Sequence, residues 1–315
     1  MPEAAEPQPT VQRLSVSALR DYRRCPRYYK LKRIDKVPDP MTHHAPAGNL
    51  VHSSYYMAYG YPTIANLGKT GRSKLEWQVS GDFDPHSATR LFEALWWREA
   101  VTDPEDKAQV IAAEEQEYKT LESLPNNLHQ AYLLLADDLQ DVNNFVPGIK
   151  KSLKGRGQKE LRAGWFEHFK EMLDNSLKHP LPHPVKSIER AVRFVLGGVD
   201  MLAYLDLVLD GELRHGLDEE IGIDLKTGYN KPSADELYFD DQIQTYRMAT
   251  GVADYWLFHM KSGEIFSIDN NSKLIQSLDE MAEQDALAIA SNYFPKRYDM
   301  KVCSRCVFRQ HCHGT

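Results

Sequence analysis

The residues best suited to chemistry lie in and before the run GIDLKTG (residues 222–228). Asp224 and Lys226 are two positions apart in this run, so on a β-strand both side chains point to the same face. Asp200 follows the pair Gly197-Gly198 and lies about one hairpin's length upstream. If these two strands pair, two carboxylates and one ammonium group meet at the edge of a sheet.

Two such carboxylates favour a bound divalent cation. Two negative charges about 4 Å apart repel by about 4 kcal/mol at an effective dielectric constant of about 20. Carboxylate oxygens select hard ions such as Mg²⁺ or Mn²⁺, which can activate water and neutralise charge on a phosphoryl oxygen. Lys226 could then contact the attacking water or the phosphate as a positive donor. The alternative is a surface Asp–Lys pair, which contributes little.

The chain has four cysteines, and they form a second candidate site: Cys25, Cys303, Cys306 and Cys312. Thiolates select Zn²⁺ or an iron–sulfur cluster, and four ligands satisfy either. A zinc ribbon usually takes its cysteines as two close pairs, whereas here one cysteine is remote from the other three. His311 and His313 flank Cys312, and we interpret them as bystanders.

The composition is typical of a globular protein. The chain has 315 residues, of which 42% are hydrophobic and 26% charged, values close to the average for globular domains. At roughly 150 residues per domain, this length suggests two domains or one domain with a large insertion. The first dozen residues are acidic and proline-rich and do not resemble a secretory signal. We therefore expect no membrane association and a cytoplasmic, reducing location, where metal ligation is a better expectation than disulfides.

The net charge of −7 conceals a strong segregation of charge. Residues 13–36 contain nine Lys or Arg against two Asp, and residues 296–315 contain five against one Asp. Local potential, rather than net charge, steers a nucleic acid. The two ends of the chain are therefore candidates for one DNA-binding patch, and the alternative is an ordinary solvated helix face.

Residue patterns predict an α/β protein interrupted by a helical segment. Apolar periodicity indicates helices over much of 86–180, β-rich runs appear from 186 to 226, and a long amphipathic helix starts near residue 272. We divide the chain into a loose tail (1–12), an N-terminal helical part (13–60), a mostly helical insertion (61–185), a core of sheet and helices (186–295) and a C-terminal cysteine segment (296–315). Aromatic residues such as Trp96 and Tyr132, with the basic run 150–162, suggest a single-strand-binding arch; the alternative is helical core.

Several short motifs, taken in order, resemble the PD-(D/E)XK nuclease superfamily in its RecB-like branch. GGVD (197–200) followed by DLKTG (224–228) resembles its catalytic core, and QIQTY (242–246) resembles its Q-x-x-x-Y helix. Upstream, GNLVH (48–52) resembles its G-x-x-x-H motif, and CPRYY (25–29) its first cluster cysteine. The cysteine spacing resembles the [4Fe–4S] staple of AddB-type and CRISPR-adaptation nucleases.

This resemblance implies a restriction-endonuclease-like fold: a central mixed sheet flanked by helices, with a large helical insertion and an iron–sulfur staple joining the N- and C-termini. It assigns Mg²⁺ or Mn²⁺ to His52, Asp200 and Asp224, water positioning to Lys226, and substrate binding to Gln242 and Tyr246. Glu189 is a weaker candidate for the metal site. The four cysteines would hold the [4Fe–4S] cluster, and the closed loop would contribute roughly 4–5 kcal/mol by analogy with a disulfide.

The implied activity is a metal-dependent exonuclease that hydrolyses single-stranded DNA or DNA ends, in recombination, repair, phage DNA processing or CRISPR adaptation. Two alternatives remain open: a structure-specific endonuclease, or a non-catalytic iron–sulfur DNA-binding subunit of a helicase–nuclease complex. The sequence lacks the G-x-x-x-x-G-K-[ST] phosphate-binding motif of a helicase. A helicase, recombinase or annealing partner would therefore be a separate chain.

Overall fold

The fold is described from a computed structural model of the chain. The structure describes residues 13–37, 44–65, 74–100, 122–141, 158–211, 219–228, 230–252, 254–304 and 306–314, together with positions 115 and 119. Within these ranges, no helix has the length and apolar composition that a membrane span requires.

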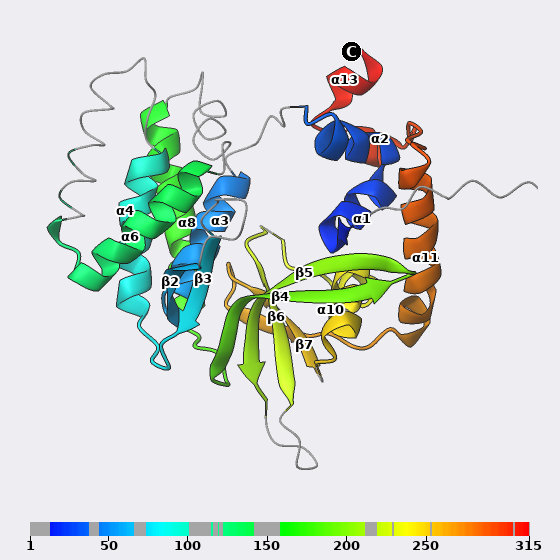
Figure 1. The fold of residues 1–315 in the computed structure, drawn as a ribbon. Helices are drawn as coiled ribbons and strands as arrows, with labels where there is room; N and C mark the ends of the chain where they lie inside the picture. The colour runs from blue at the N-terminus through cyan, green and yellow to red at the C-terminus, as the bar shows by residue number, and fades with distance from the viewer. Residues whose placement is uncertain are drawn as a thin grey trace, which may run out of the picture.

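A mixed six-stranded sheet forms the centre of the molecule (Figure 1). Its strands are β1 (Leu14–Ser15), β4 (Val185–Leu196), β5 (Val199–Asp210), β6 (Glu220–Lys226), β7 (Asp254–His259) and β8 (Glu264–Ser267). β4 pairs along almost the whole of β5, so β1 and β6 share the other edge of β5, with β1 parallel and β6 antiparallel to it. β7 runs parallel to β6, and β8 antiparallel to β7. The expected mixed sheet is confirmed.

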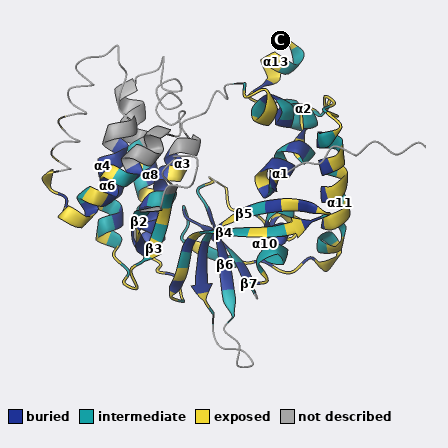
Figure 2. Cartoon of the chain, in the orientation of Figure 1, coloured by how far each residue is buried: buried dark blue, intermediate teal, exposed yellow. Residues whose placement is uncertain are grey.

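Helices cover both faces of this sheet. One face packs against α1 (Val16–Arg24), α10 (Asp241–Thr250) and α11 (Ser272–Ala290), and the other against α3 (His44–Tyr56) and helices beyond it. Each covering helix contributes an apolar stripe to the core, and the buried positions concentrate in the strands and the helix faces turned toward them (Figure 2). Ser15, Asp240 and Asn271 cap α1, α10 and α11 with side-chain oxygens.

The segment that was expected to be mostly helical also contains a β-hairpin. β2 (Gly60–Ala65) and β3 (Lys74–Val79) pair antiparallel as a separate two-stranded sheet. They lie with α4 (Pro85–Ala100), α6 (Asn126–Asp141) and α8 (Gln158–Leu177) beside the main sheet (Figure 1). Trp96 and Tyr132 are buried in the core of this part, so they serve packing and cannot stack on a nucleic acid. Residues 150–157 of the basic run lie outside the described residues.

The two ends of the described chain pack together. Short helices α2 (Pro26–Tyr29), α12 (Met300–Cys303) and α13 (Arg309–His313) and the π-helix Lys30–Ile34 surround a small apolar cluster. Its centre is Phe308, which is 0% exposed and packs against Tyr28 with ring centroids 5.3 Å apart. We call these elements, residues 25–34 and 300–313, the cysteine lobe. The lobe joins two segments that are separated by almost the whole length of the chain.

Candidate active site

Asp206 and Asp224 form the centre of the candidate site. β5 and β6 pair antiparallel with Leu207 opposite Ile223, and one further step of this register sets Asp206 opposite Asp224. Asp206 Oδ2 accepts a hydrogen bond of 2.7 Å from the backbone N–H of Leu225. The hairpin therefore holds two carboxylates together at the point where β5 and β6 separate.

Lys226 supplies the positive charge next to these carboxylates. Its Nζ lies 2.6 Å from Asp224 Oδ2. Burial raises the pKa of Asp224 to about 6; Lys226 opposes this shift and the neighbouring charge of Asp206 adds to it. Burial also raises the pKa of Asp206, and this effect exceeds the lowering caused by the hydrogen bond from the Leu225 N–H and by the charge of Lys226. Burial would lower the pKa of Lys226, but the two aspartates outweigh it and the pKa is raised, so its ammonium group stays charged.

Helix α3 brings two more side chains to the site. A β-carbon at Gly48 would lie 2.8 Å from Thr227 Oγ1, so a larger residue would force the Thr227 side chain to move, and glycine allows α3 to approach the end of β6 without that displacement. His52 follows one turn later and Tyr56 one turn after that, on the same face of the helix. The Tyr56 hydroxyl donates to Asp206, and burial raises the pKa of Tyr56 well above its ordinary value. Sequence reasoning missed Tyr56, although its i+4 spacing from His52 was a usable signal.

His52 has the character of an unused ligand. Its Nε2 atom is buried and has no hydrogen-bond partner. Burial lowers its pKa to about 4, Asp224 opposes this shift and Lys226 adds to it, so at neutral pH the imidazole is uncharged and able to bind a metal. His52, Asp206 and Asp224 thus fit a hard divalent cation by donor type. Among the described residues, however, no three His, Cys, Asp or Glu side chains are arranged as a ready-made metal site.

Asp200 does not take part in this arrangement. It lies at the start of β5, exposed, opposite Val195. Gly197 and Gly198 have φ values of 55° and 71° and form the two-residue turn of the β4–β5 hairpin. At about 3.3 Å per residue, Asp200 is about 20 Å from Asp206 along the strand. The predicted convergence of Asp200 with Asp224 is wrong, because the glycine pair is a hairpin turn and the carboxylate at the site comes six residues later.

Glu189 lies at the border of the site. The β4–β5 register, with Ile188 opposite Leu207, sets Glu189 opposite Asp206. Glu189 has a φ of 48°, a strained value for a residue other than glycine, and its charge contributes to the raised pKa of Tyr56. The structure therefore places this carboxylate near Tyr56 and Asp206, although its side chain is exposed.

Helix α10 closes the site from the other side. Gln242 Nε2 donates to the Tyr246 hydroxyl at 2.9 Å, and Arg20 of α1 donates to Gln242 Oε1 at 2.5 Å. Burial raises the pKa of Tyr246, and the charges of Asp224 and Asp206 add to the shift. The structure thus brings the Q-x-x-x-Y residues to the same site as the two aspartates.

The four cysteines also come together, at the cysteine lobe. Cys25, Cys303, Cys306 and Cys312 all line one small cavity, with Tyr28 and Leu31 beside them. None of them forms a disulfide. Burial raises the pKa of Cys312. The positive charges of Lys296 and Arg27 oppose this shift, and the neighbouring Cys25 and Cys306 add to it. The donor set and its common cavity fit a four-thiolate metal centre, although the thiols are not arranged as a ready-made site.

Comparison with protein families gives a match over almost the whole chain. The sequence profile of the PD-(D/E)XK nuclease superfamily matches residues 13–313. No curated protein matches the chain. Among solved structures, the chain is similar to one titled "Crystal structure of SSO0001", with 14% sequence identity and a TM-score of 0.33 over 58% of this chain and 80% of that chain.

We predict that Asp224 and His52 affect stability in opposite ways as pH changes. The raised pKa of Asp224, from 3.8 to about 6, makes the folded state lose stability as pH rises through that window. The lowered pKa of His52, from 6.5 to about 4, makes the folded state gain stability as pH rises from about 4 to 6.5.

The measurement is the free energy of unfolding in urea from acid to neutral pH, in metal-free buffer. Asp224→Asn should gain stability relative to the wild type as pH rises from about 4 to 6, by up to about 3 kcal/mol. Asp200→Asn, which removes an exposed carboxylate of the same sheet, is the matched control. The difference between its free energy of unfolding and that of the wild type should not change with pH. A stability difference for Asp224→Asn that does not change with pH would contradict the assignment.

Proposed function

Because the chain belongs to the PD-(D/E)XK nuclease superfamily, we propose that it is a metal-dependent deoxyribonuclease of the RecB-like branch that acts as an exonuclease on single strands or DNA ends. The observation that carries the proposal is the meeting of Asp206, Asp224 and Lys226 beside the unpartnered Nε2 of His52. This set supplies metal ligands and a fixed positive charge in one place, which phosphodiester hydrolysis requires.

In this proposal, His52, Asp206 and Asp224 hold Mg²⁺ or Mn²⁺, and Asp206 replaces Asp200 in the ligand set. When bound, the metal neutralises charge on the phosphate and lowers the pKa of a water molecule. Lys226 keeps its proton because two carboxylates stabilise it, so it can donate to the attacking water or to a phosphate oxygen. Water attacks phosphorus in line with the leaving oxygen, and that P–O bond breaks.

Tyr56 and Gln242 act on the geometry of the site rather than on the reacting atoms. Tyr56 donates to Asp206 and so fixes the carboxylate that the Leu225 N–H also holds. Gln242 is held between Arg20 and Tyr246 and can orient the substrate strand at the mouth of the site. Glu189, opposite Asp206, remains a candidate for a further metal-site contact.

We also propose that the four cysteines bind a [4Fe–4S] cluster. The support is that every cysteine of the chain lines the same cavity and none is in a disulfide. When bound, the cluster would serve as a structural staple between the two ends of the chain. Zn²⁺ is the competing occupant for the same thiolates.

The decisive comparison for the active site is between two aspartates of the same strand. Loss of a group that only supports a metal ligand costs about 10- to 100-fold, so Asp206→Asn should reduce cleavage of DNA in Mg²⁺ or Mn²⁺ by more than about 100-fold. Asp200→Asn should cleave at the wild-type rate. Cleavage rates on end-labelled DNA check this, and the reverse ranking would sink the Asp206 assignment.

Substrate topology separates the exonuclease from the endonuclease. We expect linear single strands and duplex ends to be degraded, and closed circular single strands to survive, because an exonuclease needs a free end. The Lys226→Ala variant, which loses the fixed ammonium group, is the control for contaminating nucleases. Cutting of circles would establish an endonuclease, and tight binding without cutting would favour a non-catalytic DNA-binding subunit.

Removing one thiol tests the cluster. Protein purified without oxygen should be brown and contain iron, and Cys306→Ala should be colourless and less stable, because the staple that closes the chain is lost. Ser304→Ala, in the same turn, should behave like the wild type. Visible absorption, metal content and thermal unfolding are the measurements. Zinc in place of iron, or a brown and stable Cys306→Ala protein, would refute the assignment.

A further inference from the structure

Much of the positive charge at the start of the chain is already neutralised within the protein. Arg23 pairs with Asp285 at 2.6 Å and with Asp241 at 2.9 Å, and Arg20 lies 3.6 Å from Asp240. Three further pairs share two aspartates: Lys30 with Asp35, and Lys32 and Arg33 with Asp21. The positive potential of this segment is therefore weaker than its formal charge predicts. Cationic side chains available to a ligand must be sought elsewhere in the molecule.

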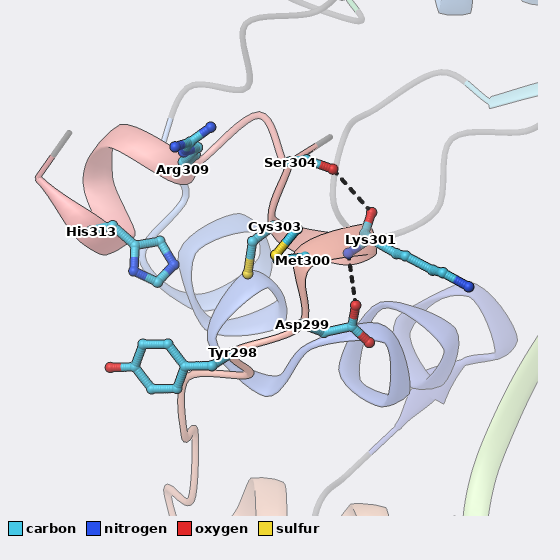
Figure 3. Close-up of a pocket in the computed structure, with 8 residues that line it drawn as sticks. All are labelled: Tyr298, Asp299, Met300, Lys301, Cys303, Ser304, Arg309 and His313. Carbon is cyan, nitrogen blue, oxygen red and sulfur yellow. Dashed lines mark hydrogen bonds between the residues drawn. The ribbon is translucent and has the colours of Figure 1, made fainter.

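The cysteine lobe carries a groove that the active site does not use. It has a volume of about 930 Å³ and is lined by Tyr298, Asp299, Met300, Lys301, Cys303, Ser304, Arg309 and His313. Figure 3 shows these residues arranged around α12, with α13 forming the other wall. This groove is open to solvent, unlike the neighbouring cysteine cavity, with which it shares Cys303, Arg309 and His313.

Two large side chains in this groove are unusually exposed. Tyr298 is 81% exposed and Met300 is 88% exposed. The Tyr298 ring lies beside the His313 ring, with centroids 5.7 Å apart and an interplanar angle of 59° (Figure 3). An aromatic ring, an imidazole and a thioether presented together form a surface on which a flat, apolar group can stack.

The charges around the groove favour an anionic ligand. The one carboxylate, Asp299, is occupied internally: it accepts from the backbone N–H groups of Lys301 and Val302 and lies 3.7 Å from Arg297. In the described part of the chain, Lys301 and Arg309 take part in no ion pair. Arg309 lies on the same side of the groove as the two rings, whereas Lys301 extends away from them (Figure 3).

We propose that this groove binds single-stranded DNA, with a base stacked on Tyr298 and a phosphate contacted by Arg309. Stacking requires a base with a free face, which a single strand offers and a duplex conceals. An anionic ligand with flat, apolar faces matches both the charge and the rings of the groove. The inference rests on the proposed function in taking DNA as the ligand, and it adds a binding site separate from the aspartates.

The test measures binding without cleavage. Full-length protein purified without oxygen is titrated with a fluorescent oligothymidylate in metal-free buffer. Tyr298→Ala should weaken binding by about 5- to 150-fold, the range that stacking of one base provides, and should bind an abasic version of the strand as the wild type does. Tyr293→Ala is the matched control, because Tyr293 is 62% exposed in the same segment and does not line the groove.

Arg309→Gln tests the phosphate contact. It should reduce the dependence of log K on log salt by about 0.7, the slope of one phosphate contact on a single strand. Lys273→Ala, which removes an exposed cation at the start of α11, should leave the slope unchanged. Thermal unfolding of each variant verifies folding.

Wild-type affinity in Tyr298→Ala, or an equal loss in Tyr293→Ala, would overturn the inference. Self-association that disappears in Tyr298→Ala, with DNA affinity unchanged, would assign the groove to a second copy of the chain instead. The proposed function fails separately, since it depends on metal-dependent cleavage and on Asp206, neither of which enters this binding measurement.

Discussion

Two carboxylates held side by side in a poorly hydrated place are the constraint around which this site is built. Left unpaired, charges in such surroundings cost several kcal/mol, and each aspartate has its own compensation. Asp206 accepts from the Leu225 N–H and the Tyr56 hydroxyl, and Asp224 lies against the Lys226 ammonium. The compensation is incomplete, since the pKa of both carboxyls is raised. Burial is the main cause of both shifts, and a divalent cation would relieve this residual cost of holding two charged carboxylates away from water.

The second requirement is that helix α3 approaches the sheet closely enough to bring His52 to the two aspartates. Gly48 permits this, because a β-carbon there would displace the side chain of Thr227, the residue after Lys226. His259 fixes the same loop from the opposite strand: its ring nitrogens lie 2.9 Å from Gly228 O and 2.9 Å from Ser262 Oγ. With the loop held on both sides, His52 faces the aspartates in an environment that keeps it neutral.

The sequence predicted the mixed sheet and the proximity of Asp224 and Lys226, and it failed where strand register decides which residues meet. The D-x-K spacing placed Asp224 and Lys226 on one face without any knowledge of partners. Choosing between Asp200 and Asp206 required knowing that Gly197 and Gly198 are the turn and that the strand starts there. An Asp inside the apolar run LAYLDLVL is costly, which was itself a signal for Asp206. The hairpin β2–β3 was missed although KLEWQV alternates with the period of a strand.

Helix α1 connects the cysteine lobe to the candidate active site. It ends at Arg24, immediately before Cys25, and its Arg20 and Arg23 side chains hold Gln242 and Asp241 on α10. Tyr22 donates to the carbonyl of Tyr293, which ties the same helix to the chain leading into the lobe. A helix of nine residues is only marginally stable alone, so its position depends on the contacts at both ends. Disturbing the thiol cavity would therefore shift the residues that hold Gln242, so α1 links the cysteine lobe mechanically to the candidate site.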